Sequence, residues 1–269
     1  MKDVQSRRDF RQIPIQKAGI KNLQYPLAVL DRENEIQHTV GQVSMFVDLP
    51  HHFKGTHMSR FVELLNEQRG QISLRNMGAI LQAVVERFNS STAHLEIRFP
   101  YFMEKTAPVS KASSLMNYQC ALLATYQRQA RPALDLIVEV VVPVTTLCPC
   151  SKAISTQGAH NQRSWITIQA RSRTLVWIEE LIEIAESAAS SGLYSLLKRA
   201  DEKLLTEQAY ARPRFAEDVA RGVARKLRRD PRITWFLVSS ENLESIHNHN
   251  AYAMVTSAGL QKPARRAPR

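Results

Sequence analysis

The longest apolar stretch of the sequence, residues 134–147, most constrains the fold. Large apolar side chains recur in it at every second position, namely at Leu134, Leu136, Val138, Val140 and Val142. This is the period of a β-strand with one buried face. Asp135, Glu139 and Pro143 interrupt the stretch, so it is too short and too interrupted to span a bilayer. We therefore expect a long strand within a sheet, which ends just before Cys148.

The remaining segments repeat one order of strands and helices. Before the long strand, the patterns predict a strand at 36–47, helices at 60–67 and 73–88 (with Ser73 as N-cap), and strands at 94–103 and 115–126. After it, they predict a strand at 164–172, helices at 178–186, 193–199 and 213–227, and strands at 233–239 and 251–256. This order indicates an α+β chain with a duplicated unit.

The ends of the chain differ from its body. Residues 1–33 are polar, punctuated by proline and without periodicity, and we expect an extended N-terminal arm there. Residues 34–130 then form a first unit, residues 131–258 a second, and residues 259–269 a basic C-terminal tail. The first thirty residues lack an apolar core of signal-peptide length, and three cysteines are too few for a disulfide scaffold. These features predict a cytoplasmic protein.

The chain is strongly basic, with 36 Lys and Arg against 25 Asp and Glu and a formal net charge of +11. Such a charge favours an anionic partner, either a nucleic acid or a phosphorylated small molecule. Aromatic residues are only 7% of the chain and are not interleaved with the basic ones, which disfavours a nucleic-acid module. The sequence also lacks a Walker loop, a GxGxxG motif after a strand and an HExxH motif.

Cys148, Cys150 and His160 follow the long strand within thirteen residues. Thiolate and imidazole are preferred ligands of zinc and related divalent metals. The alternative is an inert, buried cysteine pair with a loop histidine, although Pro149 breaks the strand and polar residues follow at once. Spacing alone leaves both interpretations open.

A second group of polar residues lies at 244–250. In an extended segment, His247 and His249 point to the same side and can face one site. A polar loop between two strands is the alternative. Together with the two cysteines and His160, the histidine pair indicates an open, catalytic metal site rather than the compact cysteine pairs of structural zinc modules.

Carboxylates supply a third group. Asp201 and Glu202 follow a short predicted helix, and Glu217 and Asp218 lie in the first turn of the helix that starts near Pro213. Acidic residues favour helix starts for electrostatic reasons. Sequence alone therefore leaves a capping role and a functional role open for each.

Five strings of the sequence resemble the signature of the type IB GTP cyclohydrolases. They are KGTHMSRF (54–61), PCSKAIS (149–155), GAHNQR (158–163), DEK (201–203) and NLESIHNHNAYA (242–253). The resemblance runs from about Val40 to Ala258, in the family's order. It implies an α+β, bimodular tunnelling fold of two ββααββ units, with antiparallel sheets and helices packed on one face. It also implies a homotetramer with active sites at the subunit interfaces.

The resemblance implies catalytic roles for Cys148, Cys150, His247 and His249, and metal ligation by Cys148, His160 and Glu202. Cys148 is expected to be the central metal thiolate and the residue most critical for catalysis. The two later histidines are expected to be further ligands or proton-transfer groups, and Cys150 a second thiol of the same pocket.

Substrate binding is expected from a carboxylate and from cations in the matching strings. Glu217 would anchor the guanine by accepting hydrogen bonds from its N–H edge. Lys54, Arg60, Lys152 and Arg163 are candidates for binding the triphosphate.

The reaction that the resemblance implies converts GTP and water to 7,8-dihydroneopterin triphosphate and formate, the first step of tetrahydrofolate and pterin synthesis. A divalent metal (zinc, manganese or iron) would activate the water that attacks guanine C8. Neither a nucleic acid nor a membrane is expected as a partner. Two alternatives are a tunnelling-fold nitrile reductase with a cysteine nucleophile and a basic, zinc-containing nucleic-acid-binding protein.

Overall fold

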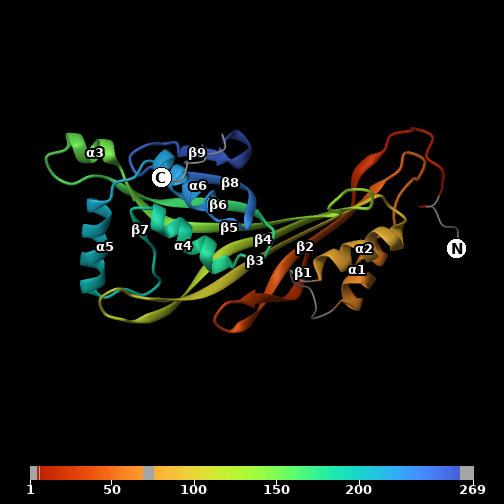
Figure 1. The fold of residues 1–269 in the computed structure, drawn as a ribbon, viewed down its shortest axis with the longest axis horizontal. Coiled ribbons are helices and arrows are strands. Elements are labelled where there is room, and N and C mark those ends of the chain that lie inside the picture. The colour runs from red at the N-terminus through yellow and green to blue at the C-terminus, as the bar shows by residue number, and fades with distance from the viewer. Residues whose placement is uncertain (1–4, 6, 69–75, 261–269) are drawn as a thin grey trace, which may run out of the picture. The chain divides into compact units, whose positions relative to one another are not determined.

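The computed structural model describes residue 5 and residues 7–68 and 76–260 (Figure 1). Its elements are, in chain order, β1 (Ile15–Asp31), β2 (Glu35–Leu49), α1 (Met58–Glu67), α2 (Met77–Phe88), β3 (Thr92–Thr106), β4 (Ser113–Gln127), β5 (Leu134–Leu147), α3 (Pro149–Ile154), β6 (Asn161–Ser172), α4 (Ile178–Ala188), β7 (Ser191–Gly192), α5 (Arg199–Ala211), α6 (Ala216–Leu227), β8 (Ile233–Asn242), β9 (Ala251–Thr256) and the 3₁₀ helix η1 (Ser257–Gly259). The chain is α+β, as predicted. Ser73, the expected N-cap, lies outside the described residues. In the part of the chain that is described, no helix combines the length and the apolar character that crossing a bilayer demands.

Contacts divide the chain into two compact units. The first consists of residues 1–103 and 117–139, and the second of residues 104–116 and 140–269. In the first unit the strands are hydrogen bonded in the order β1-β2-β3-β4, followed by the start of β5. In the second the order is β5-β6-β8-β9, with the short β7 beside β5. We predicted a boundary between residues 130 and 131 from the repeated order of strands and helices. The two units above are defined by contacts instead, so they do not test that boundary, and it stays a prediction.

Strand β1 replaces most of the predicted N-terminal arm, and that prediction was wrong. Ile15–Asp31 pair antiparallel with β2, and the backbones of Gln5, Arg7 and Asp9 are bonded to those of Gly55, Lys54 and His52. Two register shifts within residues 15–23 break the alternation that marks a strand. Pro26 lacks an N–H, but β1 is the first strand in the order, and proline is tolerated at such an edge.

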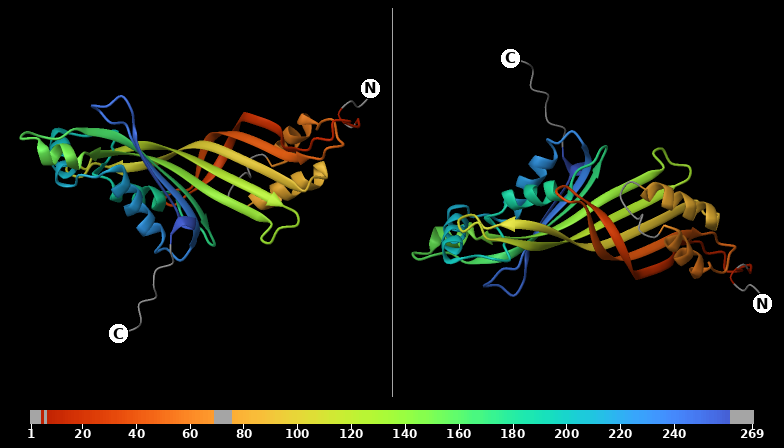
Figure 2. Two further views of the ribbon diagram at one scale, coloured as in Figure 1. Left: turned by 90° about the horizontal axis from the view of Figure 1, so that it is seen from above. Right: turned by 90° about the horizontal axis from the view of Figure 1, so that it is seen from below.

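Helices α1 and α2 pack on β1 and β2 within the first unit (Figure 2). Each helix buries one face, with the buried residues Phe61, Leu64 and Leu65 in α1 and Met77, Ile80, Leu81, Val84 and Val85 in α2. Phe61 also stacks on Phe88, with ring centroids 4.2 Å apart. Burial of one large apolar side chain contributes about 1.5–3 kcal/mol, so these faces hold the helices on the sheet.

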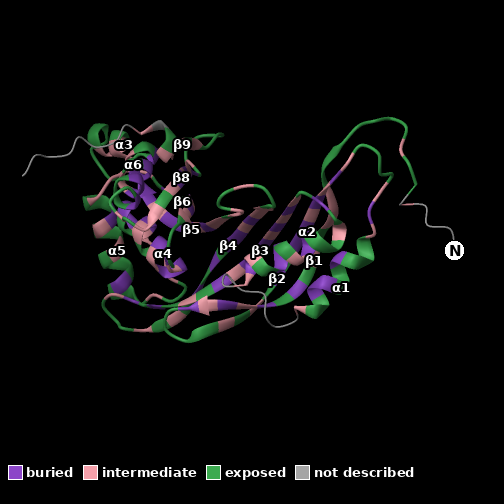
Figure 3. Cartoon of the chain, turned by 45° about the vertical axis from the view of Figure 1, so that its right-hand side comes forward, coloured by how far each residue is buried: buried purple, intermediate pink, exposed green. Residues whose placement is uncertain are grey.

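In the second unit, α6 packs on β8 and β9, and α4 packs on α6 and β6. The buried residues of α6 are Val219, Ala220, Val223, Ala224 and Leu227, and with Ala216 they form one face at helical spacing (Figure 3). The sequence predicted α4 from its apolar stripe and also placed a helix at 213–227, where α6 is found. The opposite face of α6 carries arginines and is exposed.

Helix α5 differs from the prediction. The helix expected at residues 193–199 is irregular up to its last residue, and α5 begins at Arg199. Leucine-rich composition suggested the earlier helix, whereas the start of α5 is fixed by Asp201, whose carboxylate accepts the N–H of Lys198 at 2.9 Å. Asp201 and Glu202 therefore lie within the first turn of a helix rather than after one.

Gly19→Ala is expected to destabilise the protein by about 2 kcal/mol or more. A Cβ at this position would lie 2.0 Å from the carbonyl oxygen of Met45 in β2, and backbone cannot move aside as a side chain can. Gly78→Ala in α2 is the matched control. Its Cβ would meet only the flexible Leu134 side chain, at 3.3 Å, and alanine favours a helix by up to about 1 kcal/mol over glycine. Urea unfolding measures the free energy of unfolding of both variants. Equal stabilities of the two variants would contradict the expectation.

Candidate functional site

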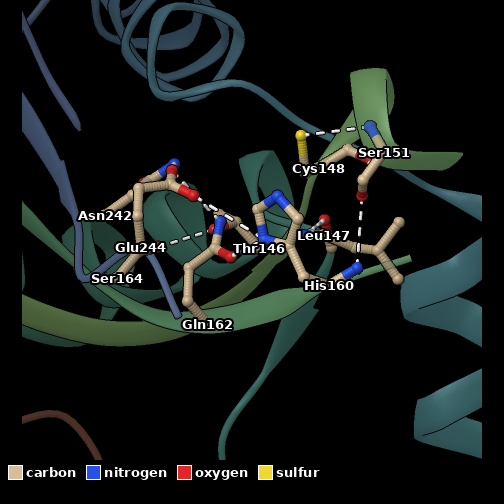
Figure 4. A network of polar contacts seen from close by, with 10 residues as sticks. Thr146, Leu147, Cys148, Ser151, His160, Gln162, Ser164, Asn242 and Glu244 are labelled. Atoms are coloured by element: carbon tan, nitrogen blue, oxygen red, sulfur yellow. Dashed lines mark hydrogen bonds and ion pairs between the residues drawn. The ribbon is translucent and has the colours of Figure 1, made fainter. Parts of the chain in front are cut away.

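Strand β5 leads directly into the short helix α3, which the sequence did not predict. Cys148 is the N-cap of α3, and Pro149 takes the first helical position, where its missing N–H costs no hydrogen bond. The N–H of Ser151 points at Cys148 Sγ, at 3.4 Å (Figure 4). The half-buried thiol thus lies at the start of a helix with one donor already directed at it, while Cys150 is exposed.

Cys148 and His160 are held together by the backbone and by one hydroxyl. The N–H of Cys148 donates to the carbonyl of His160 at 3.1 Å. Ser151 Oγ donates to the carbonyl of Cys148 at 3.3 Å and accepts the N–H of His160 at 3.2 Å. The loop between the two predicted ligands is therefore closed by hydrogen bonds, and Ser151 is a positioning residue that the sequence did not reveal.

The amide of Gln162 sets the tautomer of His160. Gln162 Nε2 donates to Thr146 Oγ1 at 3.0 Å and to Glu244 Oε1 at 3.4 Å. Since a carboxylate only accepts, the nitrogen must face Glu244, and Gln162 Oε1 then faces His160 Nδ1, at 3.0 Å. Nδ1 accordingly carries the proton, and Nε2 keeps its lone pair for a metal or a proton.

Two buried hydroxyls support this amide. Thr146 Oγ1 is 2.7 Å from Ser164 Oγ, and both residues are fully buried (Figure 4). Thr146 comes from β5, whereas Gln162 and Ser164 come from β6. The orientation of His160 is thus determined by side chains of two adjacent strands.

Glu244 is a further residue of the site that was not among the predicted ones. Its Oε2 lies 3.7 Å from His160 Nδ1, and its Oε1 accepts from Asn242 Nδ2 at 3.4 Å. Glu244 belongs to the string NLESIHNHNAYA, but the string did not indicate what it does. Its hydrogen bond to Gln162 shows that it helps to orient the amide that contacts His160.

His247 and His249 lie in a turn after β8, not in the extended segment that the sequence suggested. Their rings nevertheless stack, with centroids 5.2 Å apart and planes at 23°. The ring of His247 also meets that of His160 edge-on, at 6.5 Å. Three of the predicted histidines therefore form one cluster.

Glu202 is exposed and lines a cavity of about 380 Å³ in the second unit. Asn161, which follows His160, lines the same cavity. Throughout the described ranges, no three His, Cys, Asp or Glu side chains are grouped closely enough to hold a metal. Cys148, His160 and Glu202 are therefore not preassembled as a ligand set.

Asp201, beside Glu202, is fully buried and ties α5 to the β3–β4 turn. Its carboxylate accepts the N–H groups of Val109 and Ser110 at 2.8 and 2.9 Å and the hydroxyl of Ser110 at 2.6 Å. Burial alone would raise the pKa of Asp201, but these bonds and the one from Lys198 hold that pKa well below its usual range. Asp201 is thus an ionised structural residue.

The expected substrate-binding residues are spread over both units. Glu217 and Arg163 are exposed in the second unit, and Lys54 and Arg60 are exposed in the first. Lys152 is engaged, because its Nζ donates to the carbonyl of Tyr210 at 2.5 Å and lies 4.3 Å from that ring's centroid.

Gln162→Met is expected to weaken divalent-metal affinity about 10- to 100-fold, because His160 loses the acceptor that fixes its tautomer. Gln157→Met is the control, since Gln157 is exposed in the neighbouring loop and, within the described ranges, only its backbone is hydrogen bonded, to Ser155. Competition with a chelating indicator measures the affinity without turnover. Equal affinities in the two variants would show that the amide does not position the imidazole.

Solved structures with the same fold come from urate oxidases. That of Bacillus subtilis 168 matches with a TM-score of 0.55 at 11% identity, covering 90% of this chain and 98% of that one. A highly active mutant of the Bacillus sp. TB-90 enzyme matches with a TM-score of 0.51 at 9% identity, covering 90% and 99%. The chain therefore has the tunnelling fold, as the resemblance implied.

The sequence comparisons identify the family. Residues 1–253 match the family described as type I GTP cyclohydrolase folE2. The GTP cyclohydrolase FolE2 of Syntrophotalea carbinolica is 53% identical over 268 residues, covering 100% of this chain and 99% of that protein. The FolE2 of Syntrophus aciditrophicus is 54% identical over 255 residues, covering 95% and 99%. The chain belongs to the FolE2 family of GTP cyclohydrolases.

Proposed function

We propose that this chain converts GTP and water to 7,8-dihydroneopterin triphosphate and formate, the first step of tetrahydrofolate and pterin synthesis. Family membership and relatives that match along nearly their whole length support this reaction. The structural observation that carries the proposal is the arrangement of side chains around the imidazole of His160. Its Nδ1 is engaged by Gln162, no hydrogen bond within the described part of the chain involves its Nε2, and Glu244 and His247 lie beside it.

The residues present fit a divalent metal by donor type. Cys148 offers a thiolate, His160 an unprotonated Nε2, and Glu202 an exposed carboxylate, and these are accepted donors for zinc, manganese or iron. We assign the metal to these three residues. When bound, the metal would supply Lewis-acid chemistry that makes water nucleophilic at neutral pH.

The chain's own groups bind the substrate and move protons. His247 and His249 are exposed and stacked, so they can exchange protons with solvent while the guanine ring opens at C8 and formate leaves. Cys150 is a second thiol for the same transfers. Glu217 accepts the N–H edge of guanine. The cations that would neutralise the triphosphate are Lys54, Arg60, Lys152 and Arg163.

Removal of the metal is expected to lower GTP turnover by at least about 100-fold, since water then lacks activation. Chelated protein and protein supplied with zinc, manganese or iron would be incubated with GTP. Formate release and neopterin fluorescence after oxidation report the product. Restoration by one of these metals supports the proposal, whereas a folded protein that forms no product with any of them would contradict it.

Two alternative functions make different predictions. A nitrile reductase needs one reactive cysteine and no metal, so the histidine cluster argues against it, and NADPH oxidation with a deazapurine nitrile would reveal it. A nucleic-acid-binding protein would shift a duplex in a gel even after removal of its basic ends. We further propose a cytoplasmic homotetramer with active sites at the subunit interfaces, and light scattering would measure the number of chains.

A further inference from the structure

A group of arginines without acidic partners surrounds helix α6. Among the described residues, no hydrogen bond or ion pair engages the side chains of Arg214, Arg221, Arg225, Arg228 and Arg229. Other arginines of the chain are neutralised, as in the pairs of Arg87 with Glu67, Arg98 with Glu139, and Arg232 with Glu180 and Asp230. Five arginines without counter-charge therefore lie on or beside one helix.

The arrangement of these arginines is unfavourable without an anion. Arg221 and Arg225 are like charges four residues apart within α6, which destabilises a helix, and Arg228 and Arg229 follow directly after its end. The helix dipole favours a cation in the last turn, where Arg225 lies, but not Arg221 in the middle. Arg214 immediately precedes the N-cap, where the dipole disfavours a positive charge.

Two hollows share these side chains. The first, of about 290 Å³, is lined by four cations and one acid, namely Arg214, Arg221, Arg225, Lys226 and Asp218. The second, of about 630 Å³, shares Arg221 and Arg225 and adds Arg228 and Arg229. Arg221 and Arg225 therefore line both hollows, and the net formal charge of the first is 4 − 1 = +3.

Small residues leave room between the arginines. Gly222 and Ala188 line the first hollow, and a Cβ on Gly222 would lie 3.3 Å from the Cβ of Ala188. Among the described residues that line the two hollows, none is aromatic. A base would therefore find no aromatic ring to stack on there, whereas a compact anion would find several guanidinium groups.

We propose that this arginine pocket binds a phosphate-rich anion, namely a di- or triphosphate group. The planar guanidinium donates two parallel hydrogen bonds to phosphate oxygens, and the three arginines of the first hollow can surround one such group. Neither hollow is lined by Cys148, His160 or Glu217, so the side chains of the pocket are not those proposed to bind the metal or the guanine. The proposal goes beyond the proposed reaction and does not depend on it.

Calorimetric titration of the full chain with inorganic triphosphate tests the proposal without turnover. We expect one bound anion per chain and at least about tenfold weaker binding by Arg221→Gln/Arg225→Gln. Arg173→Gln is the control, because this exposed arginine after β6 lies outside both hollows. Thermal melting of each variant shows whether it is folded. Absent binding, or equal affinity in all the folded variants, would overturn the proposal.

Two further probes identify the source of the anion. Displacement of triphosphate by GTP, with a raised KM for GTP in the double variant, would assign the pocket to the triphosphate of the substrate. Triphosphate binding that GTP does not displace would assign it to a separate anion, and both results support the proposal. Loss of duplex DNA binding in the double variant, without any triphosphate binding in the parent chain, would overturn it in favour of a nucleic acid.

Discussion

Cys148→Ala is expected to abolish GTP turnover, with a loss of about 10³-fold or more, while the protein stays folded. The substitution removes the thiolate from the proposed metal set and the Sγ that accepts from Ser151. The side chain is half-buried at the start of α3 and is not part of a packed core, so the loss is in chemistry rather than in stability. Formate release under metal saturation measures turnover, and metal binding would be followed in parallel.

The other two cysteines provide controls for this substitution. Cys120 is buried in β4, and Cys120→Ala is expected to cost some stability while preserving turnover. Cys150→Ala tests the second thiol. We expect its loss of turnover to lie between the losses in Cys148→Ala and Cys120→Ala. Retention of more than about a tenth of the activity in Cys148→Ala would contradict a central role for this thiolate.

Asp201→Ala is expected to lower the melting temperature more than removal of any other helix cap in the second unit. The buried carboxylate accepts hydrogen bonds from Lys198, Val109 and Ser110, and alanine would leave their N–H groups without an acceptor. Turnover is expected to fall as well, because Glu202 lies in the same helical turn. Thermal unfolding and GTP turnover would be measured on the same preparation.

Asp218→Ala is the matched control for Asp201→Ala. Asp218 also caps a helix at its third position, but it accepts a single bond, from the N–H of Phe215 at 3.1 Å, and is not fully buried. Loss of such a cap costs about 1 kcal/mol. Equal falls in melting temperature would mean that the bonds from Val109 and Ser110 contribute nothing beyond ordinary capping.

The elements that the sequence predicted correctly have uninterrupted periodicity. Strand β5 carries a large apolar residue at every second position from Leu134 to Val142, and α4 and α6 each carry one apolar stripe. Strand β1 was missed because its register shifts and its proline hide the same alternation. Helix α5 was misplaced because its start depends on a hydrogen-bonded aspartate, and composition does not report that bond.

The residues of the candidate site also fall into those that the sequence suggested and those that it did not. Residue type and spacing made Cys148, His160 and the histidine pair candidates, and the family resemblance implied their roles, which stay predictions. They were not enough to find Gln162 or Glu244, whose contact joins residues 82 positions apart in the sequence. Such partners are chosen by the pairing of strands, and a single sequence does not reveal which polar side chains a sheet will place side by side.

The bonds between Asp201 and the β3–β4 turn also limit how this protein can be engineered. Val109 and Ser110 are exposed, and exposed turns are the usual sites for inserted tags, protease-cleavage sequences or new chain ends. At this turn the backbone N–H groups are the partners of a buried carboxylate, so an insertion there would uncouple α5 from the strands. An apparently permissive turn is thus a poor place to open or extend the chain.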